Sequence, residues 1–327
     1  MSARETDAWA STEGAPDAPA GRRSHKYRAV TLVAIVLIAA MAVYFLARRE
    51  EVAYFRRLSL AVVLLTLLFQ LVSQLLWNGA MLLPLRTYMK LGYWELFVVR
   101  TGGVLASYGV PVAGNIGVRL AYLRRRGLDY SQFAWATITS NVLGLAAAAA
   151  LGLIALAMLW MRAGRVPVPV VALSAAVSVL GLGGLVALGV LPRLAGHSWF
   201  QRWSWLSRMS GHEMSRRTIV SVVVFSFGRH GFNFLSFGLL YQALLHTPGQ
   251  FLNGGLVYAI TTPIRIVAIT PGNLGINEWV TAAVGMMLSF DVTIGLIVAL
   301  VFRILSFAAQ TLGGLSAAAW LALRGAE

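Results

Sequence analysis

The sequence predicts an all-α, polytopic membrane protein built from two inverted repeats. Three observations support this fold class: a high apolar content, a series of apolar runs long enough to span a bilayer, and a five-residue motif that occurs twice. Hydrophobic residues make up 58% of the chain and charged residues 12%, and the mean hydropathy is +0.73. This composition is typical of a chain that crosses a membrane several times rather than of a soluble domain.

Apolar runs indicate about 7–9 membrane segments, because roughly 20 apolar residues span the hydrocarbon layer. They cover residues 29–47, 58–83, 94–113, 131–160, 168–191, 218–245, 251–270, 274–290 and 292–321. A shift of about 160 residues places the second, third and fourth runs on the sixth, seventh and ninth. Three elements therefore repeat in the same order.

The duplicated motif has the same register. Gly114-Asn115-Ile116-Gly117-Val118 recurs 158 residues later as Gly272-Asn273-Leu274-Gly275-Ile276, and Pro111 and Pro271 lie just upstream. An interrupted helix inside a bilayer is tolerated only where it lines a cavity or is buried in protein. We therefore expect broken or re-entrant helices here, of the kind that mark substrate sites in transporters. The alternative is that both stretches are polar turns between spans.

The expected domain organisation is one membrane domain behind a short tail. Residues 1–28, polar and basic at their end, are predicted to be a disordered cytoplasmic tail, and residues 29–323 a single membrane domain. Within it, repeat one covers about 58–160, an interfacial linker about 192–216 and repeat two about 218–321. Trp199, Trp203 and Leu206 share one helical face of the linker, which fits an amphipathic helix on the membrane surface. A loop anchored by tryptophans fits equally well.

Membrane topology explains the net charge of +15 better than nucleic-acid binding does, because the basic residues are spread over short loops. We treat the N-terminus as cytoplasmic and 94–113 and the pair 251–270/274–290 as re-entrant. The cytoplasmic side then carries sixteen Lys and Arg and the outer side six. Both termini are thus predicted to be cytoplasmic, and the repeats run in opposite senses. If 94–113 crossed fully, residues 119–126 would face outside, against the positive-inside rule.

Four arginines lie near the middles of apolar runs: Arg100, Arg229, Arg265 and Arg303. A central arginine costs about 2.5–3.5 kcal/mol on insertion scales, so these residues are expected to face an interior. Acids are scarce, and only Glu278 lies inside the polar edge of a run. A cavity richer in guanidinium than in carboxylate suits a phosphate, which arginine binds bidentately. The alternative is that the arginines pair with buried acids or with carbonyls of broken helices.

The sequence shows no recognisable catalytic or metal-binding pattern. Its five histidines have no metal-ligand spacing, and HExxH, nucleophile-elbow and P-loop motifs are missing. Zero cysteines exclude disulfides, iron–sulfur clusters and thiolate metal sites. We therefore predict no cofactor, no metal and no enzymatic activity. His230, beside Arg229 and near Asn233, is expected to be a hydrogen-bonded structural residue.

Both repeated motifs carry a resemblance to a known family. Pro111, Gly114, Asn115, Gly117 and Arg119, together with Thr270 to Glu278 and Val301-Phe302-Arg303, resemble the lysylphosphatidylglycerol synthase transmembrane, or flippase-like, family. The second family motif reads approximately Pro-Gly-Gly-x-Gly-x-x-Glu, and Asn273 here replaces a glycine. The first half of family members usually ends in a helix with a Glu-Arg pair, whereas this chain has Ser140-Asn141.

The resemblance covers roughly residues 30 to 322 and implies only the translocation half of the family, without the soluble transferase domain of its synthases. It implies movement of a phospholipid or polyprenyl-linked lipid between leaflets of the bacterial inner membrane. Membrane lipids with anionic head groups are the expected partners. Two alternatives are a secondary transporter of a small soluble anion, with a closed aqueous site, and an intramembrane lipid-modifying enzyme, with clustered His and carboxylates.

Two sets of residues are predicted for the site. Those expected to bind substrate are Arg100, Asn115, Arg119, Arg229, Arg265, Asn273, Asn277, Glu278 and Arg303. Those expected to form structural turns are Pro111, Gly114, Gly117, Pro271, Gly272 and Gly275. Glu278 is expected to orient one of the arginines. The glycines are expected to let the backbone approach the head group, and close helix packing is the alternative.

Overall fold

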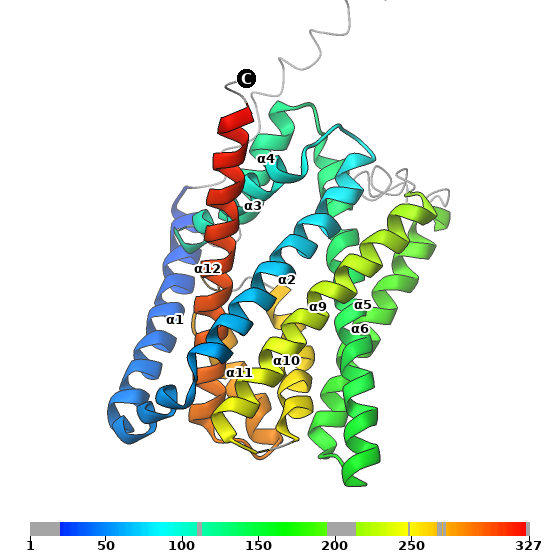
Figure 1. Ribbon diagram of the computed structural model, residues 1–327. Helices are drawn as coiled ribbons and strands as arrows, with labels where there is room; N and C mark the ends of the chain where they lie inside the picture. The colour runs from blue at the N-terminus through cyan, green and yellow to red at the C-terminus, as the bar shows by residue number, and fades with distance from the viewer. Residues whose placement is uncertain are drawn as a thin grey trace, which may run out of the picture.

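The computed structural model describes residues 20–109, 113–194, 214–247, 249–266, 270 and 273–324 (Figure 1). This part of the chain is helical and contains no strands, which confirms the all-α prediction. The predicted linker lies largely outside the described residues, as do Pro111, Pro271 and Gly272. The first helix begins at Ala20, within the predicted tail.

Long helices form the body of the molecule. They are α1 (Ala20–Ala47), α2 (Leu60–Arg86), α5 (Tyr130–Ala163), α6 (Val168–Leu194), α9 (Arg216–Leu245) and α12 (Val292–Arg324). Of the described helices, five are long and apolar enough to cross a membrane, namely α2, α5, α6, α9 and α12. The predicted count of seven to nine membrane segments includes α1 and the shorter helices, and it stays a prediction.

Shorter helices complete the fold. They are the 3-10 helix η2 (Arg49–Arg57), α3 (Tyr93–Gly109), α4 (Ala113–Arg125), α10 (Gln250–Ile266) and α11 (Ile276–Met287). The sequence did not predict α4, because its basic residues hide the helical pattern. Gly114 and Gly117, expected in a turn, lie in the first turns of α4.

The residues that precede corresponding helices of the two predicted repeats are of the same type. Ser59 and Ser215 cap α2 and α9, since each hydroxyl accepts a hydrogen bond from the backbone N–H three residues later, at 3.3 and 3.1 Å. Asp129 precedes α5 as Asp291 precedes α12, and the Asp291 carboxylate accepts from the Thr293 N–H at 2.7 Å. Corresponding helices of the two halves therefore begin with the same type of residue.

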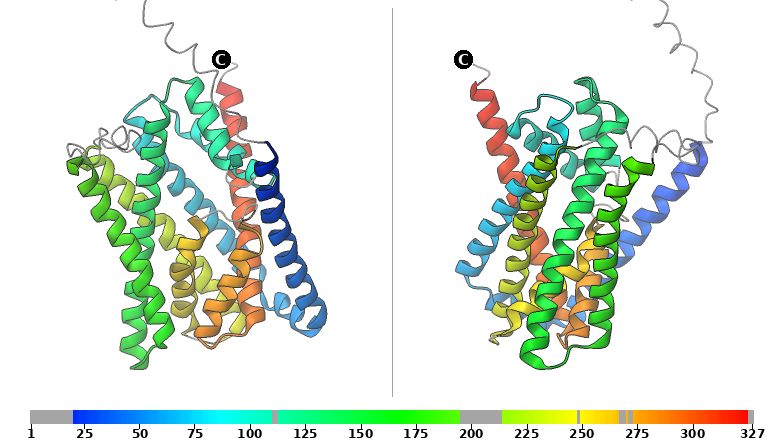
Figure 2. Two further views of the ribbon diagram at one scale, coloured as in Figure 1. Left: turned by 180° about the vertical axis from the view of Figure 1, so that it is seen from behind. Right: turned by 90° about the vertical axis from the view of Figure 1, so that its right-hand side faces the viewer.

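Helix packing follows the same correspondence. α2 packs along α9, which is its counterpart in the other half. α3 packs against α12 as α10 packs against α5, and α2 packs against α12 as α9 packs against α5. The α3–α4 hairpin lies at the end of the molecule where the chain terminates, and the α10–α11 hairpin lies at the opposite end (Figures 1 and 2).

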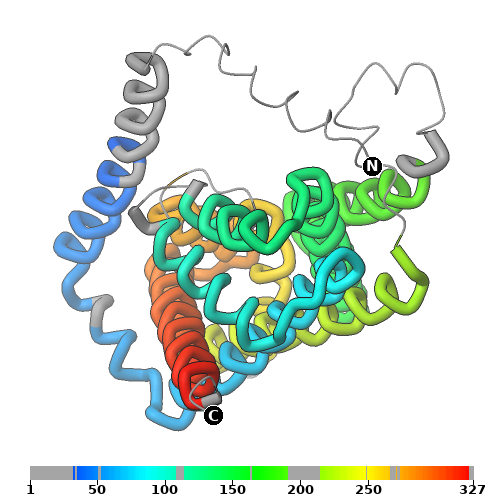
Figure 3. Tube along the Cα trace, turned by 90° about the horizontal axis from the view of Figure 1, so that it is seen from above, coloured from blue at the N-terminus to red at the C-terminus, as the bar shows by residue number. Residues whose placement is uncertain are grey.

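α1 runs along the outside of the bundle (Figure 3). Two hydrogen bonds attach it to the second half: the Trp279 indole N–H donates to the Leu37 carbonyl at 3.3 Å, and the Tyr44 and Thr293 hydroxyls lie 2.9 Å apart. α6 packs against α5 on the other side of the molecule. Both helices therefore lie outside the two predicted repeats and flank them on opposite sides.

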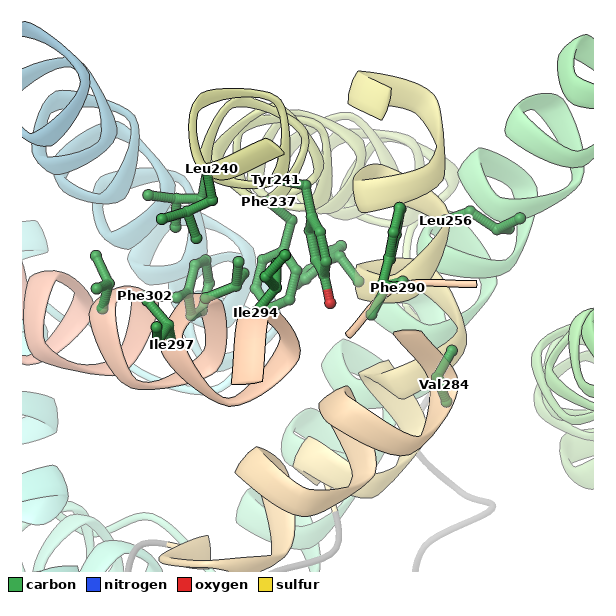
Figure 4. Packing of buried hydrophobic residues seen from close by; sticks show 14 of the residues in the cluster. Phe237, Leu240, Tyr241, Leu256, Val284, Phe290, Ile294, Ile297 and Phe302 are labelled. Atoms are coloured by element: carbon green, nitrogen blue, oxygen red, sulfur yellow. The ribbon is translucent and has the colours of Figure 1, made fainter. Parts of the chain in front are cut away.

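Two apolar clusters pack the two ends of the bundle. One joins α9, α10, α11 and α12, with Tyr241 stacked on Phe290 at a ring distance of 4.6 Å (Figure 4). The other joins α2, α3, α4 and the start of α5 around Leu96 and Leu123. Lipid is as apolar as these side chains, so the clusters stabilise the fold through close packing rather than through exclusion of water. Between them lies a polar interior.

Candidate functional site

A cavity of about 390 Å³ lies between the two hairpins and is lined by residues of α2, α4, α5, α9, α10, α11 and α12, among others. Its volume falls within the range of small-molecule sites. Eight of the nine predicted substrate-binding residues line it, which are Asn115, Arg119, Arg229, Arg265, Asn273, Asn277, Glu278 and Arg303. Arg100 is the exception.

The second motif forms a tight turn before α11. Asn273 and Gly275 have φ angles of 54° and 80°, in the left-handed region that asparagine and glycine adopt most readily. The Asn273 N–H donates to the Thr270 carbonyl at 2.8 Å, and the Thr270 hydroxyl donates to the Leu274 carbonyl at 2.9 Å. These bonds close the turn and aim the start of α11 at the cavity.

Glu278 joins this turn to α12. One carboxylate oxygen accepts the Gly275 N–H at 2.8 Å, and the other accepts the Arg303 Nε–H at 2.5 Å. Arg303 also donates from Nη2 to the Asn273 carbonyl at 2.8 Å. Glu278 is only 1% exposed, so its charge depends on these partners. The ion pair fixes Arg303 at the cavity wall.

Arg265 points into the cavity from α10. Its guanidinium lies over three aromatic rings, 4.8 Å from Phe237, 5.4 Å from Tyr258 and 5.0 Å from Phe302. Its Nε and Nη2 atoms are buried and have no hydrogen-bond partner among the described residues. Buried donors without acceptors cost about 1–3 kcal/mol each. A ligand whose atoms accept hydrogen bonds from these donors would remove that cost and so bind more tightly.

Arg119 occupies the corresponding wall on α4. It is 6% exposed, and its Nε–H donates to the Asn115 carbonyl at 3.1 Å. Its Nη1 atom lies 3.4 Å from the sulfur of Met81, a weak acceptor. The side-chain oxygen of Asn115 has no partner among the described residues. This wall therefore has an arginine but no carboxylate.

Arg229 and Arg100 share the indole ring of Trp77, with guanidinium carbons 4.1 and 4.5 Å from its centre. Arg229 lines the cavity. Arg100 is fully buried behind the lining, where its Nη2 donates to the Gln74 carbonyl at 3.0 Å and to the Gln310 side-chain oxygen at 3.2 Å. Among the described residues, neither arginine forms an ion pair.

His230 belongs to a hydrogen-bonded network across α2, α9 and α10. Its Nδ1 lies 2.7 Å from the Tyr258 hydroxyl, which also accepts from Asn233 at 3.0 Å, and Gln70 donates to Asn233 at 3.1 Å. Sequence reasoning missed Gln70, Gln74, Tyr258 and Gln310. Amide side chains in the middle of apolar runs, here Gln70 and Gln74 one helical turn apart, were the signal that could have found them.

Outside the cavity, the α3–α4 hairpin has its own polar cluster. The Tyr122 hydroxyl donates to Glu95 at 2.5 Å, and Arg126 lies 2.9 Å from the same oxygen. Burial, followed by the hydrogen bond to Glu95, raises the pKa of Tyr122. This partly buried cluster links α3 to α4, and its residues are not part of the cavity lining.

Two of the repeated glycines, Gly114 and Gly275, lie in close contact with neighbouring helices. A Cβ at Gly275 would lie 2.4 Å from the Leu37 Cβ on α1, and a Cβ at Gly114 would lie 2.5 Å from the Ala106 backbone on α3. A Cβ at Gly117 would meet no atom of another described segment within 4 Å, so a side chain fits there sterically. The geometry therefore favours close helix packing over approach to a head group at Gly114 and Gly275.

One family matches nearly the whole chain. The family described as the lysylphosphatidylglycerol synthase TM region matches residues 29–314. The chain belongs to this family. The match confirms the resemblance drawn from the two motifs and places the protein among lipid-related membrane proteins. No curated protein and no solved structure matches the chain.

Proposed function

We propose that this member of the lysylphosphatidylglycerol synthase TM family moves a lipid with a phosphate-bearing head group between the leaflets of the bacterial inner membrane. The observation that carries the proposal is the arginine-lined cavity between membrane-crossing helices, in which Arg265 has two buried donors without an acceptor among the described residues. Phosphate oxygens accept such donors, and arginine presents them in the matching planar geometry.

The size of the cavity supports a head group rather than a whole lipid. A volume of about 390 Å³ is near the lower end for ligand sites and leaves no room for two acyl chains. Two apolar lining residues, Ile116 on α4 and Phe307 on α12, are 40% and 39% exposed. Their exposure supports a cavity wall that opens toward lipid, so that tails can stay in hydrocarbon while the head group crosses. A carrier of soluble anions needs no such opening.

We also propose that the protein leaves the lipid chemically unchanged. Both carboxylate oxygens of Glu278 already accept hydrogen bonds, from Gly275 and Arg303. Because both oxygens are occupied, Glu278 is better suited to position Arg303 than to transfer a proton. A general acid or base must reach the substrate.

Transport is proposed to use two inverted repeats. The shared capping residues, the corresponding helix contacts and the position of the two hairpins at opposite ends support this interpretation. In such folds, exchange between two related packings opens a central site to each side in turn. Both termini and the basic end of α4 are proposed to be cytoplasmic, with α3–α4 and α10–α11 as re-entrant hairpins.

The orientation can be tested by labelling single cysteines in this cysteine-free chain. Leu123 is fully buried and unsuitable, whereas Ala121 is exposed on the same helix. A cysteine at Ala121 should resist a membrane-impermeant reagent applied to intact cells and react after permeabilisation. Labelling from outside would reverse the proposed topology.

The function itself is tested with purified protein in liposomes that contain fluorescent phospholipid. Arg265→Gln should slow lipid movement about tenfold or more, because one lost charged hydrogen bond costs about 1.5–3 kcal/mol. Arg216→Gln, an exposed arginine on α9, is the matched control. If the native protein moves no lipid faster than empty liposomes do, the proposal is wrong.

A further inference from the structure

Positive charge in the cavity greatly exceeds negative charge. Its lining contains four arginines, Arg119, Arg229, Arg265 and Arg303, and one acid, Glu278. Four positive charges against one negative charge leave three uncompensated. Arg100, directly behind the lining and close enough to Arg119 and Arg229 for electrostatic repulsion, adds a fourth.

The segments that join the two helices of each hairpin contain no carboxylate in the sequence. Residues 110–112, 267–269 and 271–272, which interrupt the hairpins and lie outside the described residues, are all uncharged in sequence. Glu95, the acid of the α3–α4 hairpin, is bound by Tyr122 and Arg126 at the surface. Asp129 and Asp291 precede α5 and α12 at the ends of these helices.

The uncompensated charge is concentrated at one part of the cavity. Glu278 neutralises Arg303, whereas Arg100 lies near both Arg119 and Arg229, and none of these three has an acid partner among the described residues. Aromatic faces and amide oxygens hold the Arg100 and Arg229 guanidinium groups, through Trp77, Gln74 and Gln310. Such contacts stabilise a cation but carry no net negative charge. A buried cluster of this kind is stabilised most by a ligand with several negative charges.

We propose that the head group carried by this site is a phosphomonoester or a diphosphate, with about two or more negative charges and no amine. This inference rests on the proposed function and names its substrate class. A phosphodiester has one negative charge and neutralises one of the uncompensated arginines. A phosphomonoester has a charge of about −1.5 to −2 near pH 7, and a diphosphate has more.

Aminoacylated head groups are the least suitable ligands. Lysylphosphatidylglycerol, the lipid in the name of the family, adds ammonium groups to a phosphodiester and has a net positive charge. These groups would lie among like charges at low dielectric, where repulsion is strong. In the described lining, Glu278 is the one carboxylate that could accept an ammonium, and both of its oxygens are already engaged. The site therefore selects against this lipid.

Two lipids with the same tails separate charge from size. Dioleoylphosphatidic acid is a monoester, and dioleoylphosphatidylmethanol is a diester that differs by one methyl group. Retention of each by the purified full-length protein can be measured by titration with native mass spectrometry, and translocation can be measured in liposomes. We expect the monoester to bind at least about tenfold more tightly than the diester, because its additional negative charge attracts each nearby arginine more strongly.

Protein variants locate the selectivity. Arg229→Gln removes one uncompensated charge and should reduce the preference for the monoester severalfold, while Arg216→Gln on the same helix should leave the preference unchanged. Melting temperatures in detergent show whether each variant is folded. If Arg229→Gln does not fold, Arg119→Gln serves for the same comparison.

Outcomes for the head group and for lipid transport are distinguishable. Equal binding of the two lipids, with both translocated, overturns the head-group inference and leaves the proposed function intact. Faster movement of lysylphosphatidylglycerol than of phosphatidic acid also overturns the head-group inference and leaves the proposed function intact. If inorganic pyrophosphate is taken up into liposomes while no lipid moves, the multiply charged anion is a soluble one, and both the lipid assignment and the proposed function fail.

Discussion

The two hairpins hold equivalent places in the fold but manage charge differently. In α10–α11, Glu278 pairs with Arg303, and the turn donates the Gly275 N–H to the same carboxylate. In α3–α4, Arg119 bonds to the Asn115 carbonyl and the Met81 sulfur. Counted from the aspartates that precede the two helices, Asp129 and Asp291, the position on α5 that corresponds to Arg303 on α12 is Asn141.

The difference shows that two similarly placed hairpins can carry different charge. In the α10–α11 wall, the Glu278–Arg303 ion pair is buried and geometrically complete, whereas Arg265 lacks an acceptor among the described residues. The α3–α4 wall keeps its positive charge, which the proposed anionic head group would compensate. Loss of the Glu278–Arg303 pair should therefore affect folding, whereas changes at Arg119 or Arg265 should affect ligand binding.

Removal of the carboxylate should have the largest effect. Glu278→Gln breaks a buried ion pair and removes the negative charge that the Arg303 Nε–H contacts. Loss of one member of such a pair costs about 3–5 kcal/mol, so the melting temperature in detergent should fall strongly. An unchanged melting temperature would mean that the ion pair does not stabilise the fold.

Gly275→Val should destabilise the protein and stop lipid movement together. Valine is strained at a φ of 80°, and its Cβ would collide with Leu37 on α1. Gly117→Ala on α4 is the matched control, because open space surrounds that position and alanine favours a helix. Melting and translocation of both variants should be compared. A Gly275→Val protein that is stable but inactive would instead assign this glycine to the lipid path.

Arg119→Gln should impair transport more than stability. The replaced guanidinium has one carbonyl acceptor and lies in an arginine-rich region, so its removal also relieves repulsion. We expect lipid movement to slow about tenfold or more, while the free energy of unfolding changes by less than about 1 kcal/mol. Circular dichroism melting and the liposome assay give both quantities. A large loss of stability would contradict the assignment of this wall to the ligand.

The surface ion pair of the first hairpin should matter least. Glu95→Gln removes a partner of Arg126, whose side chain is 48% exposed. Exposed pairs contribute about 0–1 kcal/mol, so the melting point should change little and transport should remain. A loss as large as that of Glu278→Gln would show that the acid of each hairpin, wherever it lies, is equally important.

Helix positions could be predicted from the sequence, because burial in lipid requires long apolar segments whatever their partners. The runs ending near 245 and 290 match α9 and α11 within a few residues, and the arginines of the apolar runs were correctly expected to face an interior. α4 was missed because a short, basic helix violates the apolar pattern. The repeat register was visible because glycine, proline and asparagine are constrained by backbone geometry alone.

Tertiary structure decided which polar groups meet. Arg100 contacts Gln310 across 210 positions of sequence and so lies behind the cavity, whereas Arg265 remains without an acceptor among the described residues although its sequence surroundings are similar. Leu37 on α1 determines why position 275 must be glycine. Hydropathy fixes the depth of a residue in the membrane, but its partner depends on how helices rotate and pack. That rotation is set by many weak contacts that no local stretch of sequence contains.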